Sequence, residues 1–410
     1  MKISTQLWTK IAIINLLIVA SLGVLMRYKI GFDFPYFSQK YILHSHSHFA
    51  FSGWVTHAIY ILLVHFITHN ITQDNTKLYN KLIFINLICS YGMLISFFTT
   101  GYSFISIGLS TATIVNNCFF AYFIFKDFKK LTHYHPSIAW FKSALWFNIF
   151  SSLGTFYLAY MMASRNFNEH WYLASVYYYL HFQYNGFFTF TCLGLIINKL
   201  PKYVPHFKYN KLIFILFFTS SIPSYFLSIL WAKIPMWLYI IVVISAIVQL
   251  IGWVMLLKDV RKFLKIEHSL PPFSKIIFMF VSLAFTIKLL LQLGSTIPEI
   301  SKLAFGFRPV VIAYLHLVLL GVISVFLLAY FYTAQILHVT KITIVALSVF
   351  LVGVFLNELV LGIQGVASFM YFPVKHINEY LFVVAIIIFI GMLLLVYAQT
   401  KHKQHHILHK

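Results

Sequence analysis

Long apolar runs separated by short polar segments dominate the chain from one end to the other. A run of roughly 20 mostly apolar residues is long enough for a helix to cross the hydrocarbon core of a bilayer. Twelve such runs can be counted, and the segments between them are too short to form a soluble domain. The pattern therefore predicts an all-α membrane protein with twelve transmembrane helices. These lie at residues 8–27, 48–68, 80–100, 103–125, 140–163, 173–198, 211–231, 235–257, 274–293, 308–332, 341–363 and 379–399.

The composition agrees with this pattern. Sixty per cent of the residues are hydrophobic and only 10% are charged, whereas charged residues make up about 25% of a typical soluble domain. The lipid bilayer is therefore the main partner of the chain. A net charge of +21 could indicate nucleic acid, but the lysines and arginines lie in short loops between apolar runs, as in membrane proteins with basic cytoplasmic loops. Nucleic acid is therefore not expected as a partner.

The basic residues also predict an orientation. The side that holds the N-terminus carries 21 lysines and arginines, the opposite side carries 8, and Lys288 lies inside a predicted span. Basic loops stay in the cytoplasm, so both termini are predicted to be cytoplasmic, as an even number of spans requires. The first apolar run lacks a small-residue cleavage site and is interpreted as an uncleaved span. These features indicate a multi-pass protein of a bacterial-type inner (plasma) membrane.

A weak threefold repeat is visible in predicted spans 2, 6 and 10. Each carries a histidine followed, after four residues, by a glycine, and the histidines are separated by 133 and 135 residues. Four helices with their loops account for this period, so we expect three four-helix units at about residues 1–135, 136–270 and 271–410. The alternative is that glycine eases helix packing and histidine satisfies a neighbouring backbone group. The pairs are His48 and Gly53, His181 and Gly186, and His316 and Gly321.

The three histidines lie at a similar depth. At about 1.5 Å per helical residue, each lies roughly 12–16 Å along its helix from the outer loop. Ionisable groups inside a membrane are rare and usually functional, and neutral imidazole is a common ligand of metals, including haem iron. The three are therefore candidate ligands. His46 competes with His48, because the phase of the helix is not determined by the sequence at its start.

Two charged residues lie deep inside predicted spans. Lys288 belongs to span 274–293 and Glu358 to span 341–363, and their depths differ by about 6 Å. They are predicted to form either a buried ion pair or two groups of a proton relay.

The predicted topology and the histidines on spans 2, 6 and 10 resemble the haem–copper oxidase subunit I superfamily, which includes cytochrome oxidases and nitric oxide reductases. This resemblance implies a low-spin haem b. Its iron would lie between a histidine of span 2, here His48 or His46, and the second histidine of a His-x-His pair on span 10, here His316. The first histidine of that pair binds a high-spin haem in the superfamily, and this chain has Tyr314 there. Tyrosinate binds haem iron in catalases.

The span 6 segment YYYLHFQYNGFF looks like the segment of nitric oxide reductases that carries a ligand of a non-haem metal, and His181 matches that ligand. The reductase has a glutamate where this chain has Asn185, and the two adjacent histidines of its span 7 have no counterpart in residues 211–231. A transition-metal site usually has three or four protein ligands. The sequence therefore argues against a complete dinuclear centre with copper or non-haem iron.

Three functions remain open from the sequence. The first is a bis-histidine haem protein that transfers electrons, with a cytochrome or quinol as donor, or that senses redox state or a gas. The second is an oxidoreductase, namely a divergent reductase of oxygen or nitric oxide. The third is a cofactor-free transporter of the same fold, with a polar cavity formed by His181, Gln183, Asn185 and Lys288. The electron donor and the substrate are not determined by the sequence.

Overall fold

The computed structural model of the chain describes residues 4–71, 75–131, 135–203, 210–232, 234–266, 272–301 and 307–401. Within these ranges all regular structure is helical and there is no strand. The α-helices are α1 (Thr5–Gly31), α2 (Gln39–Phe49), α3 (His57–Asn70), α4 (Thr76–Thr100), α5 (Phe104–Phe128), α6 (Ser137–Ala163), α7 (Glu169–His181), α8 (Thr189–Tyr203), α9 (Asn210–Ser221), α10 (Met236–Ile266), α11 (Pro272–Gly294), α13 (Arg308–His316), α14 (Val325–Thr333), α15 (Lys341–Phe369) and α16 (Ile377–Lys401).

Four shorter helical segments connect some of these helices end to end. Three are π-helices, η1 (Ala50–Thr56), η2 (Phe182–Phe188) and η4 (Leu317–Ser324). The fourth is a 3-10 helix, η3 (Pro223–Ile229), which follows α9 at a bend of 41°. Proline lacks the backbone N–H that an α-helix needs at an interior position, and Pro223 therefore accounts for the break.

Nine continuous helices in the described part of the chain are long and apolar enough to cross a membrane, and the bent pair of α9 and η3 is a tenth candidate. A multi-pass all-α membrane protein is therefore confirmed. The two remaining predicted spans, 140–163 and 173–198, fall on α6 and on the continuous run of α7, η2 and α8. Both are helical, but they are rich in tyrosine, serine and amide side chains and do not belong to this set.

The helices begin where side chains can satisfy the first backbone N–H groups. An N-cap side chain accepts a hydrogen bond from the third residue after it in four helices, which meets the need of the first turn for acceptors. The caps of α1, α5, α7 and α15 are Ser4, Ser103, Asn168 and Thr340. Ser4 and Asn168 explain why α1 and α7 begin a few residues before the predicted apolar runs.

The chain divides into two compact units. Unit 1 comprises Met1–Leu131 and Ser324–Lys410, and unit 2 comprises Thr132–Ile323. The boundary after Leu131 lies close to the end of the first predicted four-helix unit at about residue 135. The other boundary lies inside η4. The predicted division into three four-helix units stays a prediction.

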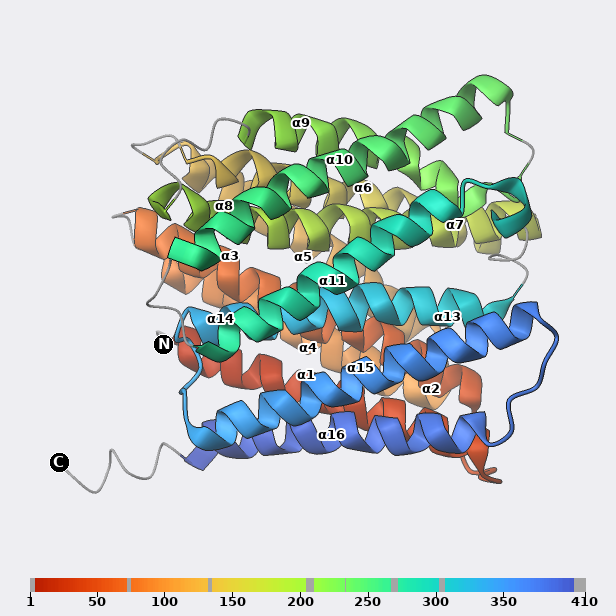
Figure 1. The fold of residues 1–410 in the computed structure, drawn as a ribbon. Helices are drawn as coiled ribbons and strands as arrows, with labels where there is room; N and C mark the ends of the chain where they lie inside the picture. The colour runs from red at the N-terminus through yellow and green to blue at the C-terminus, as the bar shows by residue number, and fades with distance from the viewer. Residues whose placement is uncertain are drawn as a thin grey trace. The chain divides into compact units, whose positions relative to one another are not determined.

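Within unit 1, α15 packs closely against α16, and α16 against α1 (Figure 1). Glycines let the backbones of α15 and α16 approach: a Cβ atom on Gly391 would lie 2.6 Å from the backbone nitrogen of Phe350, and one on Gly353 would lie 2.8 Å from Ile388 Cγ1. Small residues at helix contacts are typical of membrane proteins, in which packing rather than the hydrophobic effect drives helix association.

We expect Gly391→Ala to destabilise the protein by about 1–3 kcal/mol, because the added methyl group must push the backbone of α15 away. Gly362→Ala is the matched control, because Gly362 lies in α15, the helix that packs against α16, but has open space where its Cβ would be. Alanine there is expected to be neutral or stabilising by up to about 1 kcal/mol. Thermal unfolding of the purified variants in detergent measures both effects. Equal unfolding temperatures would contradict the packing role of Gly391.

A buried carboxylate joins α4 to α5 in the same unit. Asp127 accepts hydrogen bonds from the Tyr79 hydroxyl at 2.6 Å, from Asn75 Nδ2 at 2.9 and 3.0 Å and from Lys130 Nζ at 2.7 Å. Its side chain is only 3% exposed. Buried charges are tolerated when they are paired and hydrogen-bonded. With these donors in place, Asp127 is interpreted as a structural residue.

Candidate functional site

The three repeated histidines occupy the same local position in the structure. His48 is the penultimate residue of α2, His181 is the last of α7, and His316 is the last of α13. Each helix then continues directly as a π-helix, η1, η2 or η4. Fewer than about 1% of residues lie in π-helices, and such segments often occur at functional sites. The sequence repeat therefore corresponds to a repeated local structure.

The glycines of the repeat lie inside these π-helices. A Cβ atom on Gly53 would lie 2.6 Å from a ring carbon of Phe49, and one on Gly186 would lie 2.6 Å from Phe147 Cβ. Contacts this short leave no room for a side chain at either position. In these two copies of the repeat, glycine therefore permits close packing, which is the alternative given for it above.

Packing is much tighter after each histidine than before it. None of the nine residues of α13 is buried, whereas eight of the nine residues of α14 are. In the helix of His48, three of the 11 residues of α2 are buried, compared with 10 of the 14 residues of α3. In the helix of His181, two of the 13 residues of α7 are buried, compared with all seven residues of η2. Each pair belongs to one continuous helix, so the half that carries the histidine is the less covered half of its helix.

His48 lies against α4 and the residues that follow it. Its ring stacks on Phe97 with 4.1 Å between centroids and 16° between planes. Its Nε2 atom is 3.4 Å from the Tyr102 hydroxyl, a long hydrogen bond. His44, one turn earlier, meets Tyr102 edge-on at 4.7 Å. The imidazole of His48 is thus held in a defined orientation while the residue remains half-exposed.

His46 belongs to a different face of α2. A Cβ atom on Gly23 of α1 would lie 3.8 Å from His46 Cε1, so His46 points towards α1 while His48 points towards Phe97. The two candidate ligands of span 2 therefore differ in the direction they face, and the choice between them stays open.

His316 has one ring nitrogen committed to its own helix. Its Nδ1 atom lies 2.8 Å from the carbonyl oxygen of Ile312. A carbonyl only accepts, so Nδ1 carries the proton, and in the neutral ring Nε2 then carries the lone pair that a metal needs. A hydrogen bond from the other ring nitrogen to a backbone carbonyl is usual for histidines that bind metals.

Tyr314 and His316 are both half-buried on α13. The Tyr314 ring lies edge-on to the Tyr184 ring, with 6.3 Å between centroids. Tyr184 belongs to η2, so in unit 2 the helix of His316 lies beside the π-helix that follows His181.

His181 is fully buried, and both its ring nitrogens contact protein groups. Nε2 donates to the carbonyl oxygen of Ser221 at 2.8 Å, and Nδ1 lies 3.1 Å from Asn185 Nδ2. Ser221 is the last residue of α9 before the bend. A metal ligated by His181 would have to displace one of these two bonds.

The neighbouring amide in η2 forms a second set of buried hydrogen bonds. Gln183 Nε2 donates to Asn148 Oδ1 at 2.9 Å and to Ser151 Oγ at 2.8 Å, both on α6. Three of the four residues predicted to form a polar cavity, namely His181, Gln183 and Asn185, are therefore near one another in unit 2 with protein partners.

Lys288, on α11, is 2% exposed, and its Nζ atom lies 5.2 Å from the centroid of the Phe285 ring. Like His181, it belongs to unit 2. Glu358 belongs to unit 1, and its Oε1 atom accepts a hydrogen bond from Asn357 at 3.1 Å. The predicted Lys288–Glu358 pair joins residues of different units and stays a prediction.

A double-mutant cycle tests this pair. If the two groups interact, Lys288→Met and Glu358→Gln each destabilise the protein, and the double variant loses no more than the worse single variant. The free energy of unfolding in detergent is the quantity to measure. Costs that simply add would exclude the ion pair.

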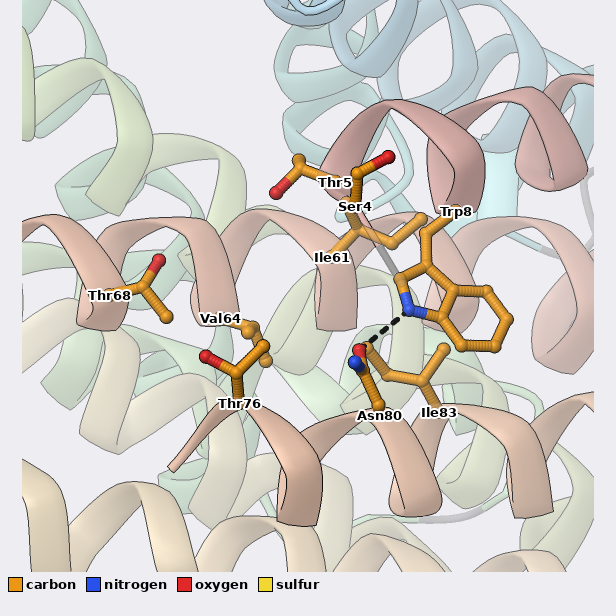
Figure 2. Close-up of a pocket in the computed structure, with 9 residues that line it drawn as sticks. All are labelled: Ser4, Thr5, Trp8, Ile61, Val64, Thr68, Thr76, Asn80 and Ile83. Atoms are coloured by element: carbon orange, nitrogen blue, oxygen red, sulfur yellow. Dashed lines mark hydrogen bonds between the residues drawn. The ribbon is translucent and has the colours of Figure 1, made fainter. Parts of the chain in front are cut away.

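A pocket of about 280 Å³ lies in unit 1, and none of the three repeated histidines lines it (Figure 2). Four hydroxyl-bearing residues line the pocket, namely Ser4, Thr5, Thr68 and Thr76. The rest of the lining comes from the indole of Trp8, the amide of Asn80 and the aliphatic side chains of Ile61, Val64 and Ile83. Trp8 Nε1 donates to Asn80 Oδ1 at 2.8 Å, as Figure 2 shows. The Trp8 ring also meets the fully buried His57 edge-on at 5.6 Å. No charged side chain lines this pocket.

Within the described ranges, no three histidine, cysteine, aspartate or glutamate side chains come together as a metal site. No protein-family model matches the sequence, and no curated protein matches it.

The sequence did not single out the buried amides that surround the π-helices. Asn15 Nδ2 donates to the carbonyl oxygen of Gly53 at 2.6 Å, and Asn86 Nδ2 donates to that of Ser52 at 3.0 Å. Asparagine inside a long apolar run is itself a signal, because an amide in a membrane needs a partner.

Proposed function

We propose that this protein is a membrane haem protein with a fold like that of haem–copper oxidase subunit I, in which His48 and His316 are the axial ligands of a low-spin haem b. The observation that carries the proposal is the hydrogen bond from His316 Nδ1 to the Ile312 carbonyl at 2.8 Å. This hydrogen bond places the proton of neutral His316 on Nδ1 and leaves the lone pair on Nε2, as an iron ligand requires. The helix that carries His316, α13, has no buried residue.

The lower burial of α2 than of α3, and of α13 than of α14, supports the proposal, because a prosthetic group would cover the halves that carry the histidines. His48 is oriented by Phe97 and Tyr102, which supports its choice over His46. His48 and His316 would hold the haem, and the haem would supply one-electron redox chemistry.

Bis-histidine ligation favours electron transfer, or sensing of redox state or a gas, over turnover of a substrate. A cytochrome or a quinol is the proposed electron donor. The proposal includes twelve transmembrane helices in three four-helix units, for which the three histidine-to-π-helix junctions are the support. It also includes cytoplasmic termini in a bacterial-type inner membrane, supported by the 21 to 8 distribution of basic residues.

Two alternatives remain proposals of lower rank. A divergent oxygen or nitric oxide reductase would need a second metal of copper or non-haem iron at His181, whose nitrogens contact Ser221 and Asn185. A cofactor-free transporter is favoured by the break between α9 and η3 and by the buried Lys288, because broken helices often form binding sites in transporters.

A reduced-minus-oxidised absorption spectrum of the protein in detergent, with and without carbon monoxide, tests the proposal. Sharp low-spin haem bands that carbon monoxide leaves unchanged are the expected result. Bands that shift with carbon monoxide would indicate an open iron position and favour the reductase. A protein without haem after expression with adequate haem supply would overturn both haem functions and leave the transporter.

A further inference from the structure

The π-helix η1 is held open by two asparagines from neighbouring helices. A π-helix replaces the normal hydrogen bond between residues i and i−4 with a wider turn, which weakens the pairing of its backbone carbonyls. In η1 the carbonyls of Ser52 and Gly53 accept hydrogen bonds from Asn86 of α4 at 3.0 Å and from Asn15 of α1 at 2.6 Å. Both asparagines are 0% exposed.

The amide of Asn15 is itself fixed. Its Oδ1 atom accepts a hydrogen bond from the Tyr91 hydroxyl at 2.8 Å, so a side chain of α4 orients the amide of α1. Buried polar groups without partners are costly in an apolar interior. The two asparagine Nδ2 groups give the two carbonyls their hydrogen bonds, and the wide turn is contacted from two neighbouring helices.

The wide turn controls the direction of His48. An α-helix rotates by about 100° per residue. Removing the extra residue of a π turn therefore rotates the part of the helix before the turn by about that angle relative to the part after it. His48 lies two residues before η1, and its ring reaches Phe97 and Tyr102 only in the present phase.

We propose that Asn15 and Asn86 are positioning residues, which hold η1 open and so set the direction in which His48 faces. The part of this inference that concerns iron ligation rests on the proposed function. The part that concerns the orientation of His48 does not, and the two parts can be tested separately.

A cysteine pair reports the orientation without haem. His48→Cys and Phe97→Cys are introduced into the full chain, whose Cys89, Cys118 and Cys192 are replaced by alanine. A short bifunctional thiol reagent is then applied to membranes. We expect efficient cross-linking with Asn15 and Asn86 present, and a loss of at least about fivefold in the Asn15→Leu/Asn86→Leu variant, because of the rotation described above.

Asn116→Leu is the matched control. Asn116 is also buried in unit 1, and its Nδ2 atom donates to a backbone carbonyl of α4, that of Leu82, at 3.2 Å, but not in a π-helix. It should retain the cross-link. Unchanged cross-linking in the double variant would overturn the inference, and so would an equal loss in Asn116→Leu. If the double variant does not fold, the cross-linking of the single variant Asn86→Leu is compared with that of the protein that keeps both asparagines and with that of Asn116→Leu.

The second readout is the haem itself. If His48 is an axial ligand, Asn15→Leu/Asn86→Leu shifts the electron paramagnetic resonance g-values of the low-spin iron or removes the signal, whereas Asn116→Leu leaves it unchanged. A cross-link that depends on the asparagines in a protein without haem would support their role in orienting His48 and refute the haem proposal. If the protein contains haem and the cross-link does not depend on the asparagines, the haem proposal is supported and the role of the asparagines in orienting His48 is refuted.

Discussion

His316→Ala is expected to remove the low-spin haem from the purified protein. The substitution deletes the imidazole whose Nδ1 donates to the Ile312 carbonyl and whose Nε2 would bind iron. Loss of even a supporting hydrogen bond to a metal-bound histidine lowers metal affinity by about 10- to 100-fold, so loss of the ligand should lower haem content by more than about tenfold. Haem per protein, from the pyridine haemochrome spectrum, measures the effect.

His376→Ala is the control for this experiment, because the His376 side chain is exposed and its imidazole contacts the exposed carboxylate of Glu379. It should keep the haem content of the unchanged protein. The same measurement on His46→Ala and His48→Ala identifies the second ligand. Of these two variants, His48→Ala is expected to lose the haem and His46→Ala to keep it. Full haem content in His316→Ala would contradict the assignment of this residue as an axial ligand.

Asp127→Leu is expected to cause the largest loss of stability among these substitutions. It leaves the Tyr79 hydroxyl, the Asn75 amide and the Lys130 ammonium without the carboxylate that they share. A buried hydrogen-bond donor left without an acceptor costs about 1–3 kcal/mol, and the Tyr79 hydroxyl and the Asn75 amide would each lose theirs. Thermal unfolding in detergent should show a clear decrease, since nearly all of the carboxylate is enclosed.

Asp259→Leu is the matched control, because in the described part of the chain Asp259 forms an ion pair with Lys262 at 3.6 Å, and that lysine side chain is 65% exposed. An ion pair with a solvent-exposed partner contributes less than about 1 kcal/mol. If both aspartate variants unfolded at the same temperature, the structural role of Asp127 would be wrong.

Much of the fold follows from local sequence. Apolar runs of sufficient length can satisfy their backbone groups in lipid only as helices, and every predicted span lies mainly on a single helix or on two or three consecutive helical segments. The break at Pro223 also follows from the sequence, because proline lacks the N–H. The predicted spans 140–163 and 173–198 are helical but are not among the helices apolar enough to cross a membrane. Their polar residues form internal hydrogen bonds, such as that between Gln183 and Asn148.

The sequence by itself determined that this is a multi-pass α-helical membrane protein, and it located three histidines at equivalent points of their helices. Composition and periodicity are sufficient for this, because the bilayer imposes the same length and the same hydrogen-bonding requirement on every span. The repeat also marked Gly53 and Gly186, although not the aromatic side chains that exclude a Cβ there.

Only the tertiary structure decided how each histidine is used. His181 is enclosed by Ser221 and Asn185, His316 has its tautomer set by Ile312, and His48 stacks on Phe97. It also showed that each histidine precedes a π-helix and that Asn15 and Asn86 bond to one of these. Such contacts depend on which helices become neighbours and on their rotation about their axes, and apolar runs of similar composition do not specify either.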